Sequence, residues 1–275
     1  MNISIGEHKT RSRVLLAPMS GVSDEPFRMA ADRHGAGLVV SEMVASEDLV
    51  RQRPDVVKRA CGSRLSGPFV IQLAGREPRW MAEGARMARE LGAEIIDINM
   101  GCPARQVTGG LSGSALMRNL DHAQTLIEAT VGATDVPVTL KMRLGWDHGS
   151  INAPELAQRA EAAGVRMITV HGRTRSQFYK GQADWAAIRS VRQATRLPLI
   201  ANGDGKSLGD IRQMLELSGA DGVMIGRGAY GRPWVVGELA EQLDPGSGIS
   251  PLSLQDKLRS IRTHYRDMQE FYGPS

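Results

Sequence analysis

Eight short apolar segments recur along the first four-fifths of the chain, and stretches with helical periodicity separate them. This alternation is typical of an α/β protein with a parallel sheet. For a chain of 275 residues we expect closure into a (β/α)8 TIM barrel, a fold of ~250 residues, with a doubly wound open sheet as the competing architecture. The expected strands are Val14 to Pro18, Leu38 to Met43, Phe69 to Leu73, Glu94 to Asn99, Pro137 to Met142, Met167 to Gly172, Pro198 to Gly203 and Gly222 to Gly226.

Local signals support helices between these segments. Apolar residues recur at helical spacing in residues 78–91, and residues 154–163 also have a helical pattern. Gly92, Gly164 and Gly219 each follow a helical stretch and suit the C-cap of a helix.

The pattern changes after Gly246. Apolar residues then step by three or four, which predicts one amphipathic helix whose apolar seam is Leu254, Leu258, Ile261, Tyr265 and Met268. The seam needs a partner, either the barrel or further helices. We therefore expect a barrel over residues 1–245 and the beginning of a C-terminal helical domain, apparently truncated, over residues 246–275.

Composition excludes several classes of protein. The two cysteines, Cys61 and Cys102, have no CxxC pair or histidine cluster beside them, so we expect neither a disulfide framework nor a metal site. The N-terminus lacks the apolar run of a signal peptide, and no later segment approaches ~18 uncharged apolar residues, so we expect a soluble, cytoplasmic protein without a membrane span. A net charge of +4 fits a polyanionic partner, and it also fits many enzymes of small substrates.

Polar residues end five of the expected strands, although strands of this fold are buried on both faces. Because side chains alternate along a strand, Lys141 should point into the barrel mouth, where the active sites of this fold lie. Each polar residue taken alone also fits a satisfied hydrogen-bonding group of the interior, but five strands together favour a site. The residues are Gln72, Asp97, Asn99, Lys141, Arg143, His171 and Asn202.

Glycine-rich turns follow the last two strands, NGDG at residues 202–205 and GRG at residues 226–228. The loops after the seventh and eighth strands are the usual phosphate site of a (β/α)8 barrel, because their backbone N–H groups can face an anion. Arg227 would supply a fixed cation. The two turns together favour a phosphate-bearing cofactor, and we interpret Asp204 as a helix cap or loop anchor.

A cysteine follows the fourth strand in the motif NMGCP, which places Cys102 on a loop at the active face. A thiol with an ordinary pKa of ~8.5 is mostly protonated at neutral pH, so Cys102 could act as a proton donor or as a nucleophile. Cys61 follows a probable helix, and we interpret it as a small buried apolar residue.

Taken in order, these motifs resemble the tRNA-dihydrouridine synthases, in particular the bacterial group whose cysteine motif is GCPA. The combination of NMGCP, HGRTR and NGD is highly specific. The matching segments are APM at 17–19, NMGCP at 99–103, GSALM at 113–117, PVTLKMR at 137–143, HGRTR at 171–175, NGD at 202–204 and GRGAYGRPW at 226–234.

The resemblance implies reduction of uridine in tRNA to dihydrouridine, with bound FMN and with NADPH as a transient reductant. Lys141 matches a lysine beside the pyrimidine side of the flavin ring, Asn99 an asparagine beside the substrate base, and Cys102 the general acid. The positions matching flavin-binding residues are Pro18, Met19, Gln72, Lys141, His171, Asn202, Gly203, Asp204, Gly226 and Arg227.

The implied chemistry needs a hydride at C6 and a proton at C5 of uracil. A base inside folded tRNA is out of reach of a buried flavin, so the uridine must leave its stack. The mouth loops carry Arg105, Arg173 and Arg175, which we expect to contact RNA phosphates, with solvated loop arginines as the alternative.

Two departures from the family pattern concern RNA binding. Arg105 and Gln106 stand where the family commonly has a lysine pair, which implies weaker contact there, and the helical domain that helps the family to hold tRNA is represented only by its beginning. We expect the protein to be a monomer and tRNA to be its partner.

Two alternatives stay open at this point. One is a flavin barrel of the dihydroorotate-dehydrogenase kind, acting on free pyrimidines. The other is a non-catalytic RNA-binding regulator on the same barrel, against which the presence of Cys102, Lys141 and His171 weighs.

Overall fold

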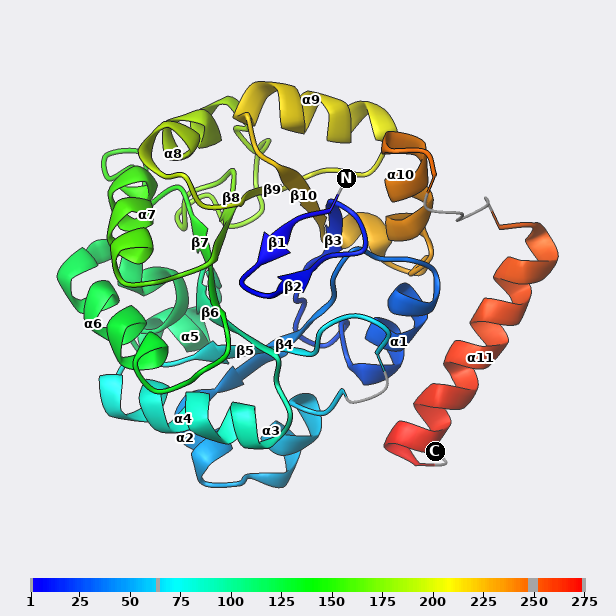
Figure 1. Cartoon of the computed structure of the whole chain (residues 1–275), viewed down its shortest axis with the longest axis horizontal. Helices are drawn as coiled ribbons and strands as arrows, with labels where there is room; N and C mark the ends of the chain where they lie inside the picture. The colour runs from blue at the N-terminus through cyan, green and yellow to red at the C-terminus, as the bar shows by residue number, and fades with distance from the viewer. Residues whose placement is uncertain (1, 63–64, 247–251, 274–275) are drawn as a thin grey trace.

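A computed structural model describes residues 2–62, 65–246 and 252–273. Its main feature is a sheet of eight parallel strands in the order β3-β10-β9-β8-β7-β6-β5-β4. The two ends of this order meet, because Leu16 N–H donates to the carbonyl of Leu38 at 2.9 Å and Leu16 forms a parallel bridge with Val39. The sheet thus closes into a barrel with helices outside it (Figure 1), which confirms the expected (β/α)8 fold and rules out the open sheet.

All eight predicted segments form strands, with shifts at their ends. The barrel strands are β3 (Val14–Leu16), β4 (Val40–Ala45), β5 (Val70–Ala74), β6 (Ile95–Met100), β7 (Val138–Arg143), β8 (Met167–His171), β9 (Leu199–Asn202) and β10 (Gly222–Ile225). The α-helices are α1 (Glu25–Arg33), α2 (Ser46–Val50), α3 (Pro54–Arg59), α4 (Pro78–Glu90), α5 (Arg105–Gly109), α6 (Leu120–Val131), α7 (Ala153–Ala162), α8 (Arg189–Ala194), α9 (Leu208–Ser218), α10 (Val235–Leu243) and α11 (Leu254–Tyr272). Short 3-10 helices are η1 (Gly113–Arg118), η2 (Ala186–Ile188) and η3 (Arg227–Ala229).

The glycines expected at helix ends lie there. Gly219 caps α9 with a φ of 67°, while Gly92 and Gly164, with φ of 92° and 98°, come one residue after the C-caps of α4 and α7. Each backbone bends in the left-handed region, which glycine enters without steric cost.

Alternation along the strands divides the apolar residues into two cores. Val14, Leu16, Ile71 and Leu73 point outward and pack under the helices. The inward-facing set fills the lower part of the barrel and comprises Leu15, Ala17, Leu38, Val40, Val70, Ile95, Met167, Ile200 and Met224. Such layers of inward side chains make the barrel interior a packed core rather than a pore.

An N-terminal hairpin closes one end of the barrel. Strands β1 (Ser4–Ile5) and β2 (His8–Lys9) lie across the end where the parallel strands begin (Figure 1), and Ile3 and Ile5 extend the inner core. Gly6, with a φ of 61°, makes the turn against Pro137, where a Cβ would lie 2.6 Å from the proline ring. Because this end is covered, the inner residues of the opposite end form the open mouth.

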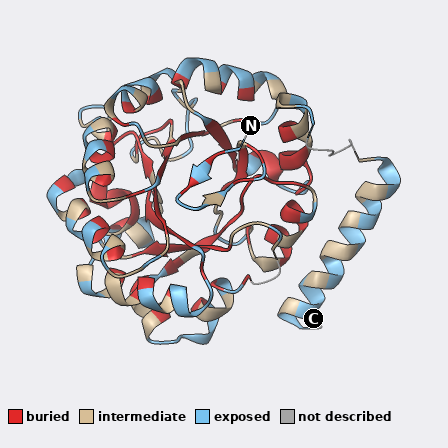
Figure 2. Ribbon diagram, viewed as in Figure 1, coloured by how far each residue is buried: buried red, intermediate tan, exposed pale blue. Residues whose placement is uncertain are grey.

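The last helix packs beside the barrel with its polar face. His34 bonds Ser260, Phe27 meets the ring of His264 edge-on, and Arg33 pairs with Asp267. The apolar seam predicted for this helix faces solvent instead, as the exposed stripe of α11 in Figure 2 shows, with side-chain exposure from 38% at Met268 to 75% at Leu254. Within the described residues, the barrel therefore does not cover the seam.

No helix within residues 2–62, 65–246 and 252–273 combines the length and the apolar character needed to cross a membrane.

Candidate active site

A cavity of about 390 Å³ opens at the C-terminal ends of the barrel strands. Its size lies in the usual range for small-molecule and cofactor sites, roughly 300 to 1,000 Å³. The twelve residues expected to contact the cofactor, the base or the reacting proton all line it. They are Pro18, Met19, Gln72, Asn99, Cys102, Lys141, His171, Asn202, Gly203, Asp204, Gly226 and Arg227.

Lys141 enters the cavity from β7, on the inward face that it shares with Thr139. Its ammonium donates to Asn202 Oδ1 at 3.1 Å, while the amide of Asn202 donates to the carbonyl of Met224 at 2.7 Å. Burial, and then the nearby Arg143, lower the pKa of Lys141 to about 8. A desolvated cation with one protein acceptor on its side of the cavity favours a ligand that brings further acceptors.

Cys102 lies in the loop after β6. Its backbone N–H donates to Asn99 Oδ1 at 2.9 Å, and its carbonyl accepts from the hydroxyl of Ser114 at 2.8 Å, so the loop is held from both sides. Burial raises the pKa of the Cys102 thiol, although the N–H of Ala104 and the cations Arg143 and Lys141 oppose the shift. The thiol is therefore protonated at neutral pH, which suits a proton donor better than a nucleophile.

The interpretation of Cys61 as a buried apolar residue is wrong. Cys61 is exposed two residues after the end of α3, where its thiol donates to the carbonyl of Val57 at 3.4 Å. Its neighbours Ala60 and Gly62 are buried, so the chain after α3 alternates between core and solvent, and the sequence did not indicate which side Cys61 would face.

His171 ends β8 at the wall of the cavity. Burial, reinforced by Arg143, Lys141, Arg173 and Arg227, lowers the pKa of His171 well below its ordinary value. The ring is therefore neutral at neutral pH and can both donate and accept a hydrogen bond. Asp204 is the one acidic residue among the cavity-lining residues that the structure describes. The cavity is accordingly a cation-rich environment that favours an anionic ligand.

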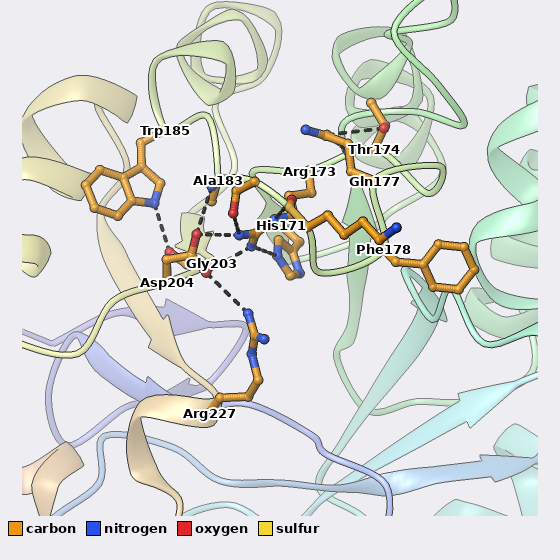
Figure 3. A network of polar contacts seen from close by, with 12 residues as sticks. His171, Arg173, Thr174, Gln177, Phe178, Ala183, Trp185, Gly203, Asp204 and Arg227 are labelled. Atoms are coloured by element: carbon orange, nitrogen blue, oxygen red, sulfur yellow. Dashed lines mark hydrogen bonds and ion pairs between the residues drawn. The ribbon is translucent and has the colours of Figure 1, made fainter.

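Asp204 anchors the loop after β9, as Figure 3 shows. Its carboxylate accepts both terminal nitrogens of Arg173, at 3.0 and 2.6 Å, and lies 3.3 Å from the guanidinium of Arg227. Asp204 itself has a left-handed φ of 60°, and the indole of Trp185 donates to the carbonyl of the preceding Gly203 at 2.8 Å. These contacts support the interpretation of Asp204 as a loop anchor.

Arg173 does not match the expected RNA contact. Only 1% of the residue is exposed, and besides Asp204 its guanidinium donates to the carbonyls of Lys180 and Gly181 at 3.1 and 2.7 Å. A buried arginine with its donors used inside the fold has nothing left for a phosphate in solvent. Its role is to hold the loop after β8 against the glycine-rich turn after β9 (Figure 3).

The two glycine-rich turns touch one another at the cavity. A Cβ on Gly228 would lie 2.7 Å from the carbonyl oxygen of Gly205, so the close approach requires glycine. A Cβ built on Gly226 would make ordinary van der Waals contacts with Ala17 and Met19, each at 3.7 Å. The turns therefore form a compact surface with Arg227 and Lys206 beside it.

Arg105 and Arg175 lie at the rim. Arg105 is exposed at the start of α5, next to the cavity-lining Gln106. The guanidinium of Arg175 stacks on Trp146 at 4.5 Å, and Arg118 approaches the same ring at 5.0 Å. These distances are typical of cation–π contacts. Arg175 Nη2 also donates to the hydroxyl of Thr108 at 3.3 Å, and its Nε is buried without a partner among the described residues.

Arg143, Met43 and Tyr179 are among the cavity residues that were not assigned roles from the sequence. Arg143 was noted as a strand-ending cation, and its position on the same face as Lys141 was the available signal. Met43 faces the cavity because a register shift between Val40 and Met43 interrupts the alternation in β4, so alternation alone could not indicate it. Tyr179 gave no signal, because it lies on the loop after β8 and reaches the cavity only by folding, with Arg143 and Arg227 5.6 and 4.9 Å from its ring centre.

Comparison with known proteins gives a consistent result. A family model described as dihydrouridine synthase matches residues 15–275. The chain is 58% identical over 266 residues to a probable tRNA-dihydrouridine synthase of Rhizobium leguminosarum bv. phaseoli, covering 96% of the chain and 80% of that protein. It is 43% identical over 271 residues to tRNA-dihydrouridine synthase B of Escherichia coli, covering 98% of the chain and 84% of that protein.

Two solved structures have a fold similar to that of this chain. Histamine dehydrogenase from Rhizobium sp. superposes with a TM-score of 0.65 at 14% identity, over 88% of this chain and 47% of the other. Mandelate oxidase superposes with a TM-score of 0.56 at 20% identity, over 99% and 77% of the two chains. At such identities the likeness concerns the barrel alone.

Proposed function

Because the chain belongs to the dihydrouridine synthase family and reduces uridine in tRNA to dihydrouridine, we propose that its cavity binds FMN, that NADPH reduces the flavin, and that Cys102 supplies the proton. The observation that supports this proposal most directly is the convergence of Lys141, Cys102 and the two glycine-rich turns on one cavity of about 390 Å³.

The residues present fit FMN. Burial lowers the pKa of the Lys141 ammonium to about 8, and an anionic reduced flavin ring would stabilise its charged form. The touching glycine-rich turns with Arg227 suit a monophosphate. Pro18 and Met19 supply apolar surface for a planar ring. Bound FMN would supply the hydride that reaches C6 of uracil.

Cys102 would then deliver the proton to C5. Its thiol keeps the proton at neutral pH because burial raises its pKa, and the two bonds to its backbone hold it at the cavity wall. Neutral His171 and protonated Lys141 hold and orient the ligand without competing for that proton. The position of Cys102 in the cavity lining supports its proposed role as the acid.

The RNA would reach this mouth with one nucleotide flipped out. We propose that Arg105 and Arg175 contact its phosphates at the rim, and that α11 begins a helical unit that assists them. Two exposed cations, Arg262 and Arg266, lie off the apolar seam of α11 and would face an RNA backbone. Lys257 also lies off the seam, but it pairs with Glu238 of α10 at 3.5 Å. The unit would cover the exposed seam.

We propose that the protein acts as a monomer in the cytoplasm, where its tRNA substrate is made, because the twelve residues proposed for the site all line one cavity of a single barrel.

The function is tested with the purified protein. We expect a flavin absorbance band, loss of that band under anaerobic NADPH, and its return on addition of tRNA with formation of dihydrouridine. Free uridine nucleotides serve as the control substrate, because a barrel acting on free pyrimidines would reoxidise with them instead. A colourless protein that stays colourless after FMN is added would contradict the cofactor assignment.

The rim arginines give a separate prediction about RNA. Replacing Arg105 or Arg175 by Gln should weaken tRNA binding and lower the slope of log affinity against log salt by about 1 for each lost phosphate contact. The measurement is tRNA affinity at several salt concentrations. Arg86→Gln, which removes the same charge from the exposed face of α4, is the matched control. Unchanged slopes in both rim variants would show that RNA is held elsewhere.

A further inference from the structure

A buried carboxylate lies one layer below the cavity, where the proposed chemistry does not use it. Asp97 is 4% exposed on the inward face of β6. Its two oxygens accept one bond each, Oδ2 from the amide of Gln72 at 2.6 Å and Oδ1 from the hydroxyl of Thr139 at 2.5 Å. Burial raises the pKa of Asp97, whereas these two bonds and Lys141 lower it.

From Asp97 a chain of hydrogen bonds leads to the loop that carries Cys102. Asn99 Nδ2 donates to Gln72 Oε1 at 2.7 Å. Asn99 Oδ1 in turn accepts the backbone N–H groups of Gly101 at 3.1 Å and Cys102 at 2.9 Å. Two side-chain amides therefore connect a carboxylate to two backbone donors.

Both ends of this series of hydrogen bonds, which we call the relay, have a fixed polarity. Backbone N–H groups can only donate, and the Asp97 oxygen facing Gln72 accepts. An amide has one donating and one accepting end, so a single arrangement of Gln72 and Asn99 satisfies every bond. Reversing either amide places N–H against N–H or oxygen against oxygen, and an unpaired buried polar group is costly.

We propose that Asp97 is a positioning residue, which fixes the amide orientations of Gln72 and Asn99 and through them holds the backbone of Cys102. The expected effect on catalysis rests on the proposed role of Cys102. The effect of Asp97 on the position of the Cys102 backbone does not depend on that role. The relay needs an acceptor rather than a charge, because a neutral carboxyl group that donates to Thr139 still accepts from Gln72.

The test uses the holoenzyme with Cys61→Ser, so that Cys102 is the only thiol. Asp97→Leu removes the acceptor, Asp97→Asn keeps an oxygen for Gln72, and Thr139→Val removes the bond that lies outside the relay. The measurements are the rate of Cys102 alkylation by iodoacetamide and the hydrogen exchange of the peptide that contains Gly101 and Cys102. Circular dichroism and thermal melting check the fold of each variant.

We expect Asp97→Leu to speed alkylation and exchange about fivefold, the factor that corresponds to losing one hydrogen bond of about 1 kcal/mol. Asp97→Asn and Thr139→Val should stay close to the parent protein. The kcat for tRNA reduction should fall in Asp97→Leu. If Asp97→Leu does not fold, Gln72→Met interrupts the same relay and should show the same increase.

Equal alkylation rates in Asp97→Leu and Thr139→Val would overturn the proposal. So would an Asp97→Asn variant as fast as Asp97→Leu, because charge rather than polarity would then matter. Alkylation and exchange need no tRNA, so a failure of the proposed function would appear separately, as absent dihydrouridine formation in the parent protein.

Discussion

Cys102→Ala is expected to slow oxidation of the reduced flavin by tRNA by roughly 10²- to 10⁴-fold, the usual contribution of a positioned acid. Flavin binding and reduction by NADPH should persist, because the thiol lines the cavity wall without bonding through Sγ to the residues proposed for the cofactor. The measurement is single-turnover reoxidation of the reduced enzyme by tRNA, followed by absorbance.

Cys61→Ala is the matched control for this experiment. Cys61 is exposed beyond α3 and outside the cavity lining, and its thiol donates to the carbonyl of Val57, so its loss should leave reoxidation unchanged. Reoxidation of Cys102→Ala at the parental rate would remove Cys102 from the mechanism.

Lys141→Met is expected to weaken FMN binding by about 10- to 100-fold, because a charge-assisted hydrogen bond contributes about 1.5 to 3 kcal/mol. The flavin-free protein should meanwhile be at least as stable as the parent, since the variant no longer buries a cation whose pKa is lowered to about 8. Affinity is measured by fluorescence titration and stability by thermal melting with and without FMN. Lys180→Met, which removes an exposed charge outside the cavity lining, is the control.

The same lysine predicts a pH dependence. In the folded protein Lys141 loses its proton near pH 8, whereas in the unfolded chain it does so near ~10.4, so between these values the unfolded state holds more protons. The contribution of Lys141 to the stability of the flavin-free protein therefore rises with pH across this window. FMN binding should do the opposite and weaken as pH rises above about 8, and Lys141→Met should abolish this dependence. A pH-independent affinity in the parent protein would contradict the proposed contact.

Much of the site could be predicted because strand alternation is a local property. Asn99 and Lys141 lie at positions of their strands that must face inward, and they line the cavity as expected. The glycine-rich turns could be placed for the same reason, since the order of strands in a (β/α)8 barrel puts the last two beside one another. For these residues and turns, the alternation along each strand and the strand order of the fold were sufficient for the prediction.

Other features depended on contacts between distant parts of the chain. In the sequence Arg173 is one of two arginines on the loop after β8, and only the fold brings Asp204 against it and buries it. Tyr179 reaches the cavity in the same way. Cys61 could not be assigned to core or surface, because the end of a helix as short as α3 carries no periodicity to indicate its buried side.

The helix α11 separates the two kinds of information most clearly. Its sequence alone determined that a helix forms and which residues share its apolar seam, because both follow from a repeat of 3.6 residues. Which face meets the barrel was decided by the tertiary structure, where Ser260, His264 and Asp267 find partners on α1 and its C-cap residue, and the seam stays exposed. Periodicity defines the faces of an element, but the partner of each face depends on residues far away in the chain, which the periodicity does not encode.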